Sequence, residues 1–402
     1  MVMTALERCK YFGVSNIQGM AYHPGPSNYK KGTPYDSIYH RSDFYNNIFT
    51  QLWSEEGNDE TGVQGRGDLK RFKDQLGVNF IHCYDWSEPI IQRDQHGKDL
   101  KFLVHKPFFD ACHDLGMKVT IPISNHIMRL MASGDMAEAH ELIRAILGEV
   151  GQRPPHPAAG MIKIFNEYEL VEHPKPEHVA QVISWILEWE GNLEDKFCLP
   201  IMVCTSFGMK DDIEGAGYMK DVFLAMKRSS GLNPIAEKVW RTRMVFATNP
   251  QREGSAIEDY LENRLPAYWE KNNIPVPPVM FTELGSSIEQ TGSEEKQAEW
   301  MTEQIKASRP GSSGGNMLGA CIFLNEERVW ETGPELTFGI TRFGPDTTWG
   351  RPDKNGEAKT VFPVWDNGGW FWGKEGTYPV EQQVPKLNYK SVANAWRRSG
   401  KE

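Results

Sequence analysis

The sequence predicts an α/β protein that folds as a (β/α)8 TIM barrel with long first and last βα loops. Short, almost continuously apolar runs recur eight times along the chain, which is typical of parallel strands buried on both faces. Amphipathic segments with helical spacing separate these runs, and such regular alternation favours a closed barrel over an open doubly wound sheet. The 402 residues, 39% of them hydrophobic, suffice for one large core, so we expect a single catalytic domain over 1–402.

Each predicted element follows from the local sequence. The predicted strands are 11–17, 78–84, 118–123, 161–166, 200–205, 243–248, 278–283 and 319–324. The predicted helices are 67–76, 104–115, 135–150, 177–190, 217–228, 255–271, 293–308 and 388–398. Two strands follow a helix that ends in Gly and a short polar step, in "DQLGVNFIHCY" and "CHDLGMKVTIP". Glycine can adopt the left-handed conformation that caps a helix, as the junction of a βα repeat requires.

Two predicted connections are much longer than the few residues typical of such loops. The first runs from 18 to 66, and the second is a loop insertion at 325–387. Both follow the C-terminal end of a strand, so they should lie over the face where barrel enzymes bind their substrates. Flat aromatic rings are typical of surfaces that stack against sugar rings. We expect such platforms among Tyr22, Trp330, Trp365, Trp370 and Trp372.

The overall charge and the missing motifs exclude several classes of partner. The net charge is -10 and no Lys/Arg-rich run occurs, which argues against binding to nucleic acid or to an anionic membrane. No apolar stretch approaches about 18 residues, so no membrane span is expected. Neither GxGxxG nor GxxxxGK[ST] follows a predicted strand, and we predict no cofactor. The six scattered cysteines lack CxxC spacing, which indicates buried free thiols.

The N-terminal sequence bears on the cellular compartment. "MVMTALERCKYFGV" lacks the basic, apolar and small-residue order of a signal peptide. We therefore expect a cytoplasmic protein, or a secreted or periplasmic one whose leader has been removed. Both alternatives stay open at this stage, as does the oligomeric state.

Two glutamates lie at the ends of predicted strands. Glu167 follows Asn166 at the end of the fourth strand, in "IKIFNEYELVEH", and Glu283 ends the seventh, in "VMFTELGSS". Cleavage of a glycosidic bond needs one carboxyl group to protonate the leaving oxygen and another to attack the anomeric carbon or to activate water. We predict Glu167 and Glu283 as the catalytic residues. Asn166 is placed to hydrogen-bond the hydroxyl group beside the anomeric carbon.

Several motifs together resemble a known group of enzymes. The Asn-Glu and Glu strand ends are similar to those of the retaining (β/α)8 glycoside hydrolases of clan A. Within that clan, "GVSNIQGMAYHPG", "DQLGVNFIHCYDW", "GMKVTIPIS" and "FNEYE" resemble the fungal β-1,3-glucanosyltransferases and the related β-1,3-glucanases, over most of 11–344. The resemblance implies that Glu167 is the acid/base and Glu283 the nucleophile. It also implies substrate contacts for Asn166, Tyr22 and Tyr84.

The sequence departs from the pattern of these families at three places. His82 stands where the families have an Arg in the second strand, and Pro122 lies near the position of an Asp in the third. Leu324-Asn325 replaces an aromatic residue after the eighth strand. These differences leave open the glycosidic linkage and the choice between hydrolysis and transglycosylation.

Further polar residues follow the strand ends. Asp85 and Trp86 come directly after the second strand and are well placed to line a cleft. Glu326 follows the eighth strand and could contact sugar hydroxyls or form a salt bridge with Arg328. Glu169 projects in a direction similar to that of Glu167, but it lies beyond the strand end and is better interpreted as a loop residue.

The predicted partner is therefore an oligosaccharide or polysaccharide, cleaved by a retaining glycosidase or transglycosylase that acts on a β-linked glucan. Two other interpretations stay open: a metal-dependent barrel lyase or isomerase, and a sugar-binding barrel without catalysis. His82 and His126 could join the glutamates in a metal site, but HxH and HExxH spacings are absent, and we predict no metal. The fold alone does not decide, because barrels host many chemistries.

Overall fold

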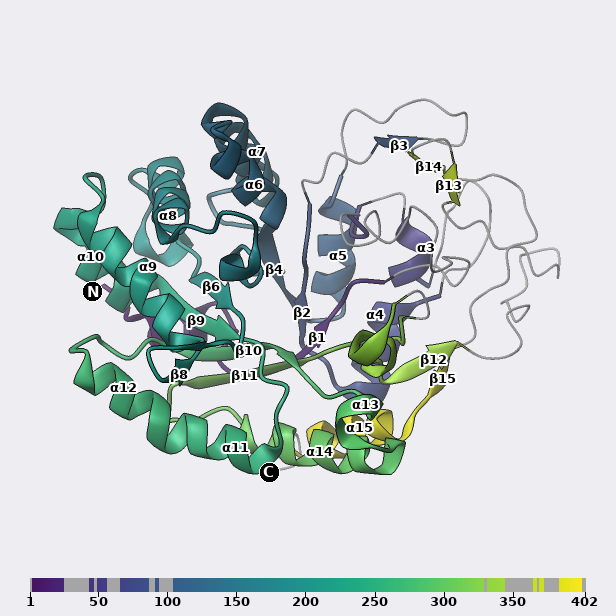
Figure 1. Cartoon of the computed structure of the whole chain (residues 1–402). Helices are drawn as coiled ribbons and strands as arrows, with labels where there is room; N and C mark the ends of the chain where they lie inside the picture. The colour runs from purple at the N-terminus through teal and green to yellow at the C-terminus, as the bar shows by residue number, and fades with distance from the viewer. Residues whose placement is uncertain are drawn as a thin grey trace.

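The computed structural model describes residues 2–24, 43–46, 49–55, 66–86, 91–93, 104–328, 331–343, 364–366, 369–371 and 383–399. Eight parallel strands form a barrel at the centre of the molecule (Figure 1). The barrel is closed, in the order β1-β11-β10-β9-β6-β5-β4-β2. The strands are β1 (Ile17–Ala21), β2 (Phe80–His82), β4 (Lys118–Ile123), β5 (Ala159–Ile164), β6 (Ile201–Thr205), β9 (Met244–Thr248), β10 (Val279–Leu284) and β11 (Met317–Ile322). The predicted (β/α)8 fold class is confirmed.

Helices surround the strands (Figure 1). They are α1 (Ala5–Tyr11), α3 (Thr50–Trp53), α4 (Asp68–Arg71), α5 (Lys106–Asp114), α6 (Asn125–Ser133), α7 (Met136–Val150), α8 (Pro176–Glu190), α9 (Ala216–Arg228), α10 (Ala236–Arg243), α11 (Gly254–Asp259), α12 (Leu265–Lys271), α13 (Ile288–Thr291), α14 (Glu294–Ala307) and α15 (Leu387–Ser399). A π-helical turn, Phe72–Leu76, extends α4, and another, Tyr260–Arg264, joins α11 to α12. All eight predicted helices are present, with ends shifted by at most a few residues, whereas α1, α3, α6, α10 and α13 were not predicted.

The first strand lies later in the chain than predicted. The prediction places it at 11–17, but α1 still occupies Tyr11 and β1 begins only at Ile17. A capping box fixes the start of α1, because the Thr4 hydroxyl accepts from the Glu7 N–H while the Glu7 carboxylate accepts from the Thr4 N–H. The helix therefore takes up Tyr11, and residues 12–16 connect it to the strand, which begins only at Ile17.

Barrel closure requires a glycine where the first and last strands meet. Gly319 on β11 pairs with Ile17 on β1 and has a φ of 122°, a conformation that other residues rarely adopt. A Cβ atom at this position would lie 2.1 Å from the Ile17 carbonyl oxygen. Any side chain here would therefore force β1 and β11 apart.

The remaining strands belong to connections that follow barrel strands. A two-stranded sheet pairs β12 (Thr341–Phe343) with β15 (Gln383–Pro385), and another pairs β7 (Met209–Lys210) with β8 (Ile213–Glu214). A three-stranded sheet contains β13 (Val364–Asp366), β14 (Gly369–Phe371) and β3 (Ile91–Arg93). The last connection therefore returns to pair with the chain that follows β2.

The six cysteines are all buried free thiols, as predicted from their scattered positions. Each lies in or beside the apolar core formed by the barrel strands and their helices. In the part of the chain that the structure describes, no helix has the length and apolar character needed to cross a membrane.

A buried ion pair joins α8 to α10. The Arg243 guanidinium donates to both carboxylate oxygens of Glu190 at 2.7 Å and also to the Leu199 carbonyl oxygen. The side chains of Arg243 and Glu190 are 6% and 5% exposed. Neither charge is solvated, so each depends on the other.

Arg243→Met should lower the free energy of unfolding by about 3–5 kcal/mol, because it leaves the Glu190 carboxylate buried without its cation. Urea unfolding followed by tryptophan fluorescence measures the loss. The double variant Arg243→Met/Glu190→Leu should recover most of it, because an apolar pair then replaces the ion pair. A loss below about 1 kcal/mol in the single variant, the value of an exposed pair, would contradict this account.

Candidate active site

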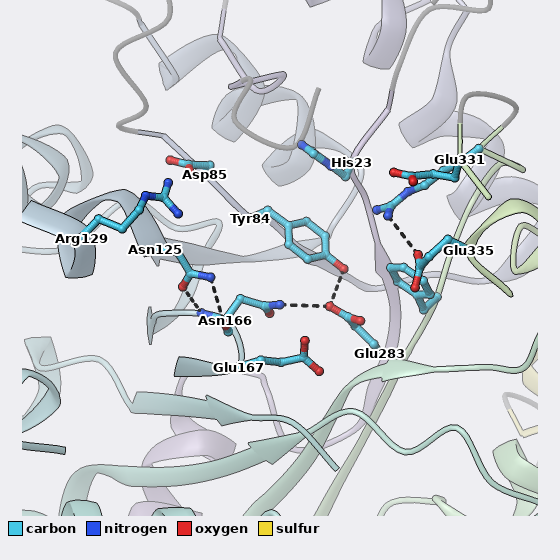
Figure 2. A pocket seen from close by; sticks show the side chains of 12 residues that line it. His23, Tyr84, Asp85, Asn125, Arg129, Asn166, Glu167, Glu283, Glu331 and Glu335 are labelled. Atoms are coloured by element: carbon cyan, nitrogen blue, oxygen red, sulfur yellow. Dashed lines mark hydrogen bonds and ion pairs between the residues drawn. The ribbon is translucent and has the colours of Figure 1, made fainter. Parts of the chain in front are cut away.

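A cavity of about 400 Å³ lies at the C-terminal ends of the barrel strands, within the size range of small-ligand sites. Its lining is His23, Tyr84, Asp85, Asn125, Arg129, Asn166, Glu167, Glu283, Phe323, Arg328, Glu331 and Glu335. Figure 2 shows the two glutamates facing this space from neighbouring positions. The structure thus brings together Glu167, Glu283, Asn166, Tyr84 and Asp85, all of which were predicted as site residues.

Glu283 is the last residue but one of β10 and is 7% exposed. Its Oε1 atom accepts hydrogen bonds from the Tyr84 hydroxyl at 3.0 Å and from the Asn166 side-chain amide at 3.3 Å (Figure 2). Burial and the Glu335 charge raise the pKa of Glu283, while the Tyr84 hydrogen bond and the Arg328 and Lys163 charges lower it. The pKa of Glu283 is raised overall, and the hydrogen bonds and nearby cations limit this rise.

Glu167 lies three residues beyond the end of β5 and is half-buried. Its Oε1 atom accepts one hydrogen bond, from the Asn249 side-chain amide at 3.0 Å. Burial, together with the neighbouring Glu283 charge, raises the pKa of Glu167 to about 8. At neutral pH this carboxyl group is mostly protonated and can donate a proton.

The backbone that carries these groups is held in an unusual conformation. Phe165 and Glu167 have φ angles of 57° and 48°, in the left-handed region that residues with side chains seldom occupy. The Asn125 side chain holds the intervening residue: it accepts from the Asn166 N–H at 2.8 Å and donates to the Asn166 carbonyl at 2.9 Å. This double hydrogen bond fixes the direction in which Asn166 and Glu167 leave the strand.

A buried cation lies beneath the cavity. Lys163, on β5, is fully buried, and its ammonium lies 4.8 Å from the centre of the Tyr84 ring and 3.4 Å from His82 Nε2. Burial lowers the pKa of both Lys163 and His82. His82 is thus a buried, hydrogen-bonded histidine. Lys163 places positive charge below the phenol that donates to Glu283.

Three predicted site residues do not line the cavity. Tyr22 is fully buried, and its hydroxyl donates to Asp68 at 2.9 Å, while its neighbour His23 reaches the cavity instead. Trp86 is 4% exposed and stacks on His105, with 4.5 Å between ring centres. Glu326 is buried, and its carboxylate pairs with Arg66 at 3.2 Å rather than with Arg328. In each case a contact made after the strand end turns the side chain away.

The aromatic residues of the last connection are only partly placed. Trp330 and Trp372 lie outside the described residues, so their predicted role in sugar binding stays a prediction. Trp365 on β13 and Trp370 on β14 are register partners in an antiparallel strand pair. The other loop glutamate, Glu169, accepts from the Ser206 N–H at 2.6 Å and does not line the cavity.

Several lining residues were not predicted. Asn125, two residues after β4, lines the cavity, and Asn249, directly after β9, does not line it but donates to Glu167. The rule that function lies beyond barrel strand ends could have found both. Arg328, Glu331 and Glu335 come from the last connection, where no sequence periodicity indicates the path of the chain. Among the described residues, no three His, Cys, Asp or Glu side chains are grouped so that they could hold a metal ion.

No protein-family model matches the chain, and no curated protein matches it. Solved structures are similar at low identity. A GH2 β-galacturonidase from Eisenbergiella tayi is 15% identical, with a TM-score of 0.48, over 95% of this chain and 51% of its own. Saccharomyces cerevisiae Gas2p in complex with laminaritriose and laminaritetraose is 14% identical, with a TM-score of 0.43, over 95% and 64%. CJP38, a β-1,3-glucanase of Cryptomeria japonica pollen, is 13% identical, with a TM-score of 0.44, over 73% and 95%.

The chain spans about half of the galacturonidase and under two thirds of Gas2p. At these identities the likeness concerns the fold alone, which the closed parallel barrel already establishes. The chemistry of the site has to be argued from its own residues.

Proposed function

We propose that the protein is a retaining glycoside hydrolase or transglycosylase that acts on a β-linked glucan or oligosaccharide. One observation carries the proposal: carboxyl groups from the ends of β5 and β10 line one cavity, where Glu167 accepts a single hydrogen bond while Glu283 accepts two and lies near two cations. Such a pair is what a two-step displacement at an anomeric carbon requires.

In the first step the Glu283 carboxylate attacks the anomeric carbon, and the bond from this carbon to the leaving oxygen breaks. The carboxyl group of Glu167 gives its proton to that oxygen. In the second step the Glu167 carboxylate takes a proton from water or from an acceptor hydroxyl, whose oxygen attacks the anomeric carbon. The bond to Glu283 breaks, and the β configuration is restored.

The hydrogen bonds support this division of roles. Glu283 accepts from two donors and lies near two cations, as a nucleophile that must be ionised needs. Glu167 accepts from a single amide and has a pKa of about 8, as a general acid at neutral pH needs. The reverse assignment would require the better stabilised carboxylate to carry the proton.

The other residues that line this cavity are suited to binding a sugar. Asn166 lies beside both glutamates, where its amide can reach the hydroxyl next to the anomeric carbon. Tyr84 and Asp85 offer a hydroxyl and a carboxylate to other sugar oxygens. Tyr22, Trp86 and Glu326 act instead as structural residues in this proposal, because each is buried against other side chains.

Product analysis on β-1,2-, β-1,3-, β-1,4- and β-1,6-glucans, with and without excess acceptor, tests the reaction class and the linkage. A 2-deoxy-2-fluoroglucosyl fluoride should leave a covalent sugar on the peptide that contains Glu283, detected by mass spectrometry. Activity that disappears on exhaustive chelation would favour a metal-dependent lyase or isomerase. Binding of a glucan without turnover or adduct would favour a non-catalytic barrel.

Lys163→Met should move the acidic limb of the pH profile of kcat/KM to higher pH, since removal of a nearby buried cation raises the pKa of Glu283. On acidification, the variant should therefore lose activity at a higher pH than the wild type does. Met202→Leu is a matched control, because Met202 is the register partner of Lys163 on β6 and carries no charge. An acidic limb that stays in place in Lys163→Met would show that Lys163 serves packing alone.

A further inference from the structure

Glu167 lies between two cavities. Besides the first, it lines a second cavity of about 330 Å³. The other residues of this lining are Phe207, Asn249, Gln251, Arg252 and Gln290. They come from the chain that follows β6 and β9 and from α13. Glu283 lines the first cavity and not the second.

This asymmetry orients a substrate across the site. Glu283 must meet the anomeric carbon, whereas Glu167 must meet the oxygen that joins this carbon to the leaving group. A sugar attacked by Glu283 therefore occupies the first cavity. The leaving group, which is attached through the oxygen that meets Glu167, therefore extends into the second cavity.

The second cavity has the chemical character of a sugar-binding surface. The half-buried Phe207 ring offers an aromatic face, and it is held by edge-to-face contact with Tyr260 at 5.0 Å. The side-chain amides of Asn249 and Gln251 each carry both donors and an acceptor, as sugar hydroxyl groups do.

The capping box of α13 orients a third amide. The Gln290 side-chain oxygen accepts from the Ser287 N–H at 2.9 Å, and its NH₂ group donates to Gln251 Oε1 at 3.4 Å. The two glutamine amides are thereby held beside each other at the edge of the cavity. Among the described residues of this lining, Glu167 carries the only carboxyl group, and Arg252 adds further donors.

We propose that the second cavity is the leaving-group and acceptor site, and that it binds a pyranose unit with free hydroxyl groups. The inference rests on the proposed function, because it uses the roles of Glu167 and Glu283. It implies transfer of the glycosyl group to sugar acceptors. The acceptor hydroxyl gives its proton to the Glu167 carboxylate, its oxygen bonds to the anomeric carbon, and the bond to Glu283 breaks with its electron pair returning to the carboxylate.

The test uses β-D-glucosyl fluoride as the donor, because fluoride is too small to fill the second cavity. Laminaribiose is added as the acceptor, and chromatography measures the ratio of transfer product to glucose. Both products arise from one covalent intermediate, so the ratio is independent of how fast that intermediate forms. Phe207→Ala and Gln251→Ala should each lower the ratio about tenfold, which corresponds to about 1.4 kcal/mol of acceptor binding.

Gln152→Ala is the matched control, since Gln152 lines a separate cavity beside Trp189 and donates to the Trp189 carbonyl oxygen. Its ratio should equal that of the wild type. An unchanged ratio in both site variants, or transfer to laminaribiose no better than transfer to methanol in the wild type, overturns the acceptor site and leaves the glycosidase proposal standing. Failure of the wild type to release fluoride counts against the proposed function itself.

Discussion

Glu283→Gln is expected to lower kcat on the best β-glucan substrate by about 10⁴-fold or more, equivalent to at least about 5.5 kcal/mol of barrier. The amide retains the shape of the carboxylate, and its oxygen can still accept from the Tyr84 hydroxyl. It has no nucleophilic oxygen, however, so the covalent intermediate cannot form. Steady-state kinetics measure the loss, and an unchanged thermal midpoint shows that the fold is retained.

A second readout separates a lost nucleophile from general damage. Azide added to Glu283→Ala should restore turnover and give an α-glycosyl azide, because azide enters from the face that the carboxylate has vacated. Glu172→Gln is the matched control, because the Glu172 side chain is 82% exposed and lines neither cavity. Its kcat should stay within about twofold of the wild type. Wild-type turnover in Glu283→Gln would exclude the nucleophile role.

The strands and the two glutamates could be predicted because a single rule links them. Buried parallel strands appear as apolar runs, and side chains just beyond their C-terminal ends converge over the barrel. Glu283 lies close to the position that this rule predicts, since it is the last residue but one of β10. The position of the first strand could also have been predicted better. Thr4 and Glu7 form the T-x-x-E signature of a helix start, three residues apart in the printed sequence.

The directions of side chains beyond the strand ends could not be predicted. Once the chain leaves the extended conformation, the two-residue alternation of a strand no longer fixes which way a side chain points. Tyr22 and His23 are neighbours, yet Tyr22 turns toward Asp68, a residue 46 positions later, while His23 reaches the cavity. Such outcomes depend on long-range contacts.

The same limit applies to the last connection. Glu326 is held by Arg66, and Arg328 by Glu335, whose side chain lines the cavity. The two glutamates lie in one connection and have different surroundings, which composition and periodicity do not distinguish. The prediction that this connection contributes to the site could be made from its length, but its individual contacts could not.

Glu167→Gln should abolish the basic limb of the pH profile of kcat/KM. Glu167 must be protonated to act as the acid, and its pKa is raised to about 8, so wild-type activity should fall as the pH rises through about 8. Glutamine does not titrate, so this limb should be absent in the variant. The variant should also lose about 10²–10⁴-fold in kcat on glucans, whose leaving oxygen needs a proton.

The loss of activity in Glu167→Gln should depend on the leaving group of the substrate. This dependence identifies Glu167 as the proton donor more directly than the size of the loss does. Fluoride departs without a proton from Glu167, so formation of the glycosyl-enzyme from β-D-glucosyl fluoride should be far less impaired than formation from a glucan. Rapid-quench measurement of fluoride release gives this step directly. Equal losses on both donors would mean that Glu167 binds substrate rather than donating a proton. A basic limb that persists near pH 8 in Glu167→Gln would assign it to another group.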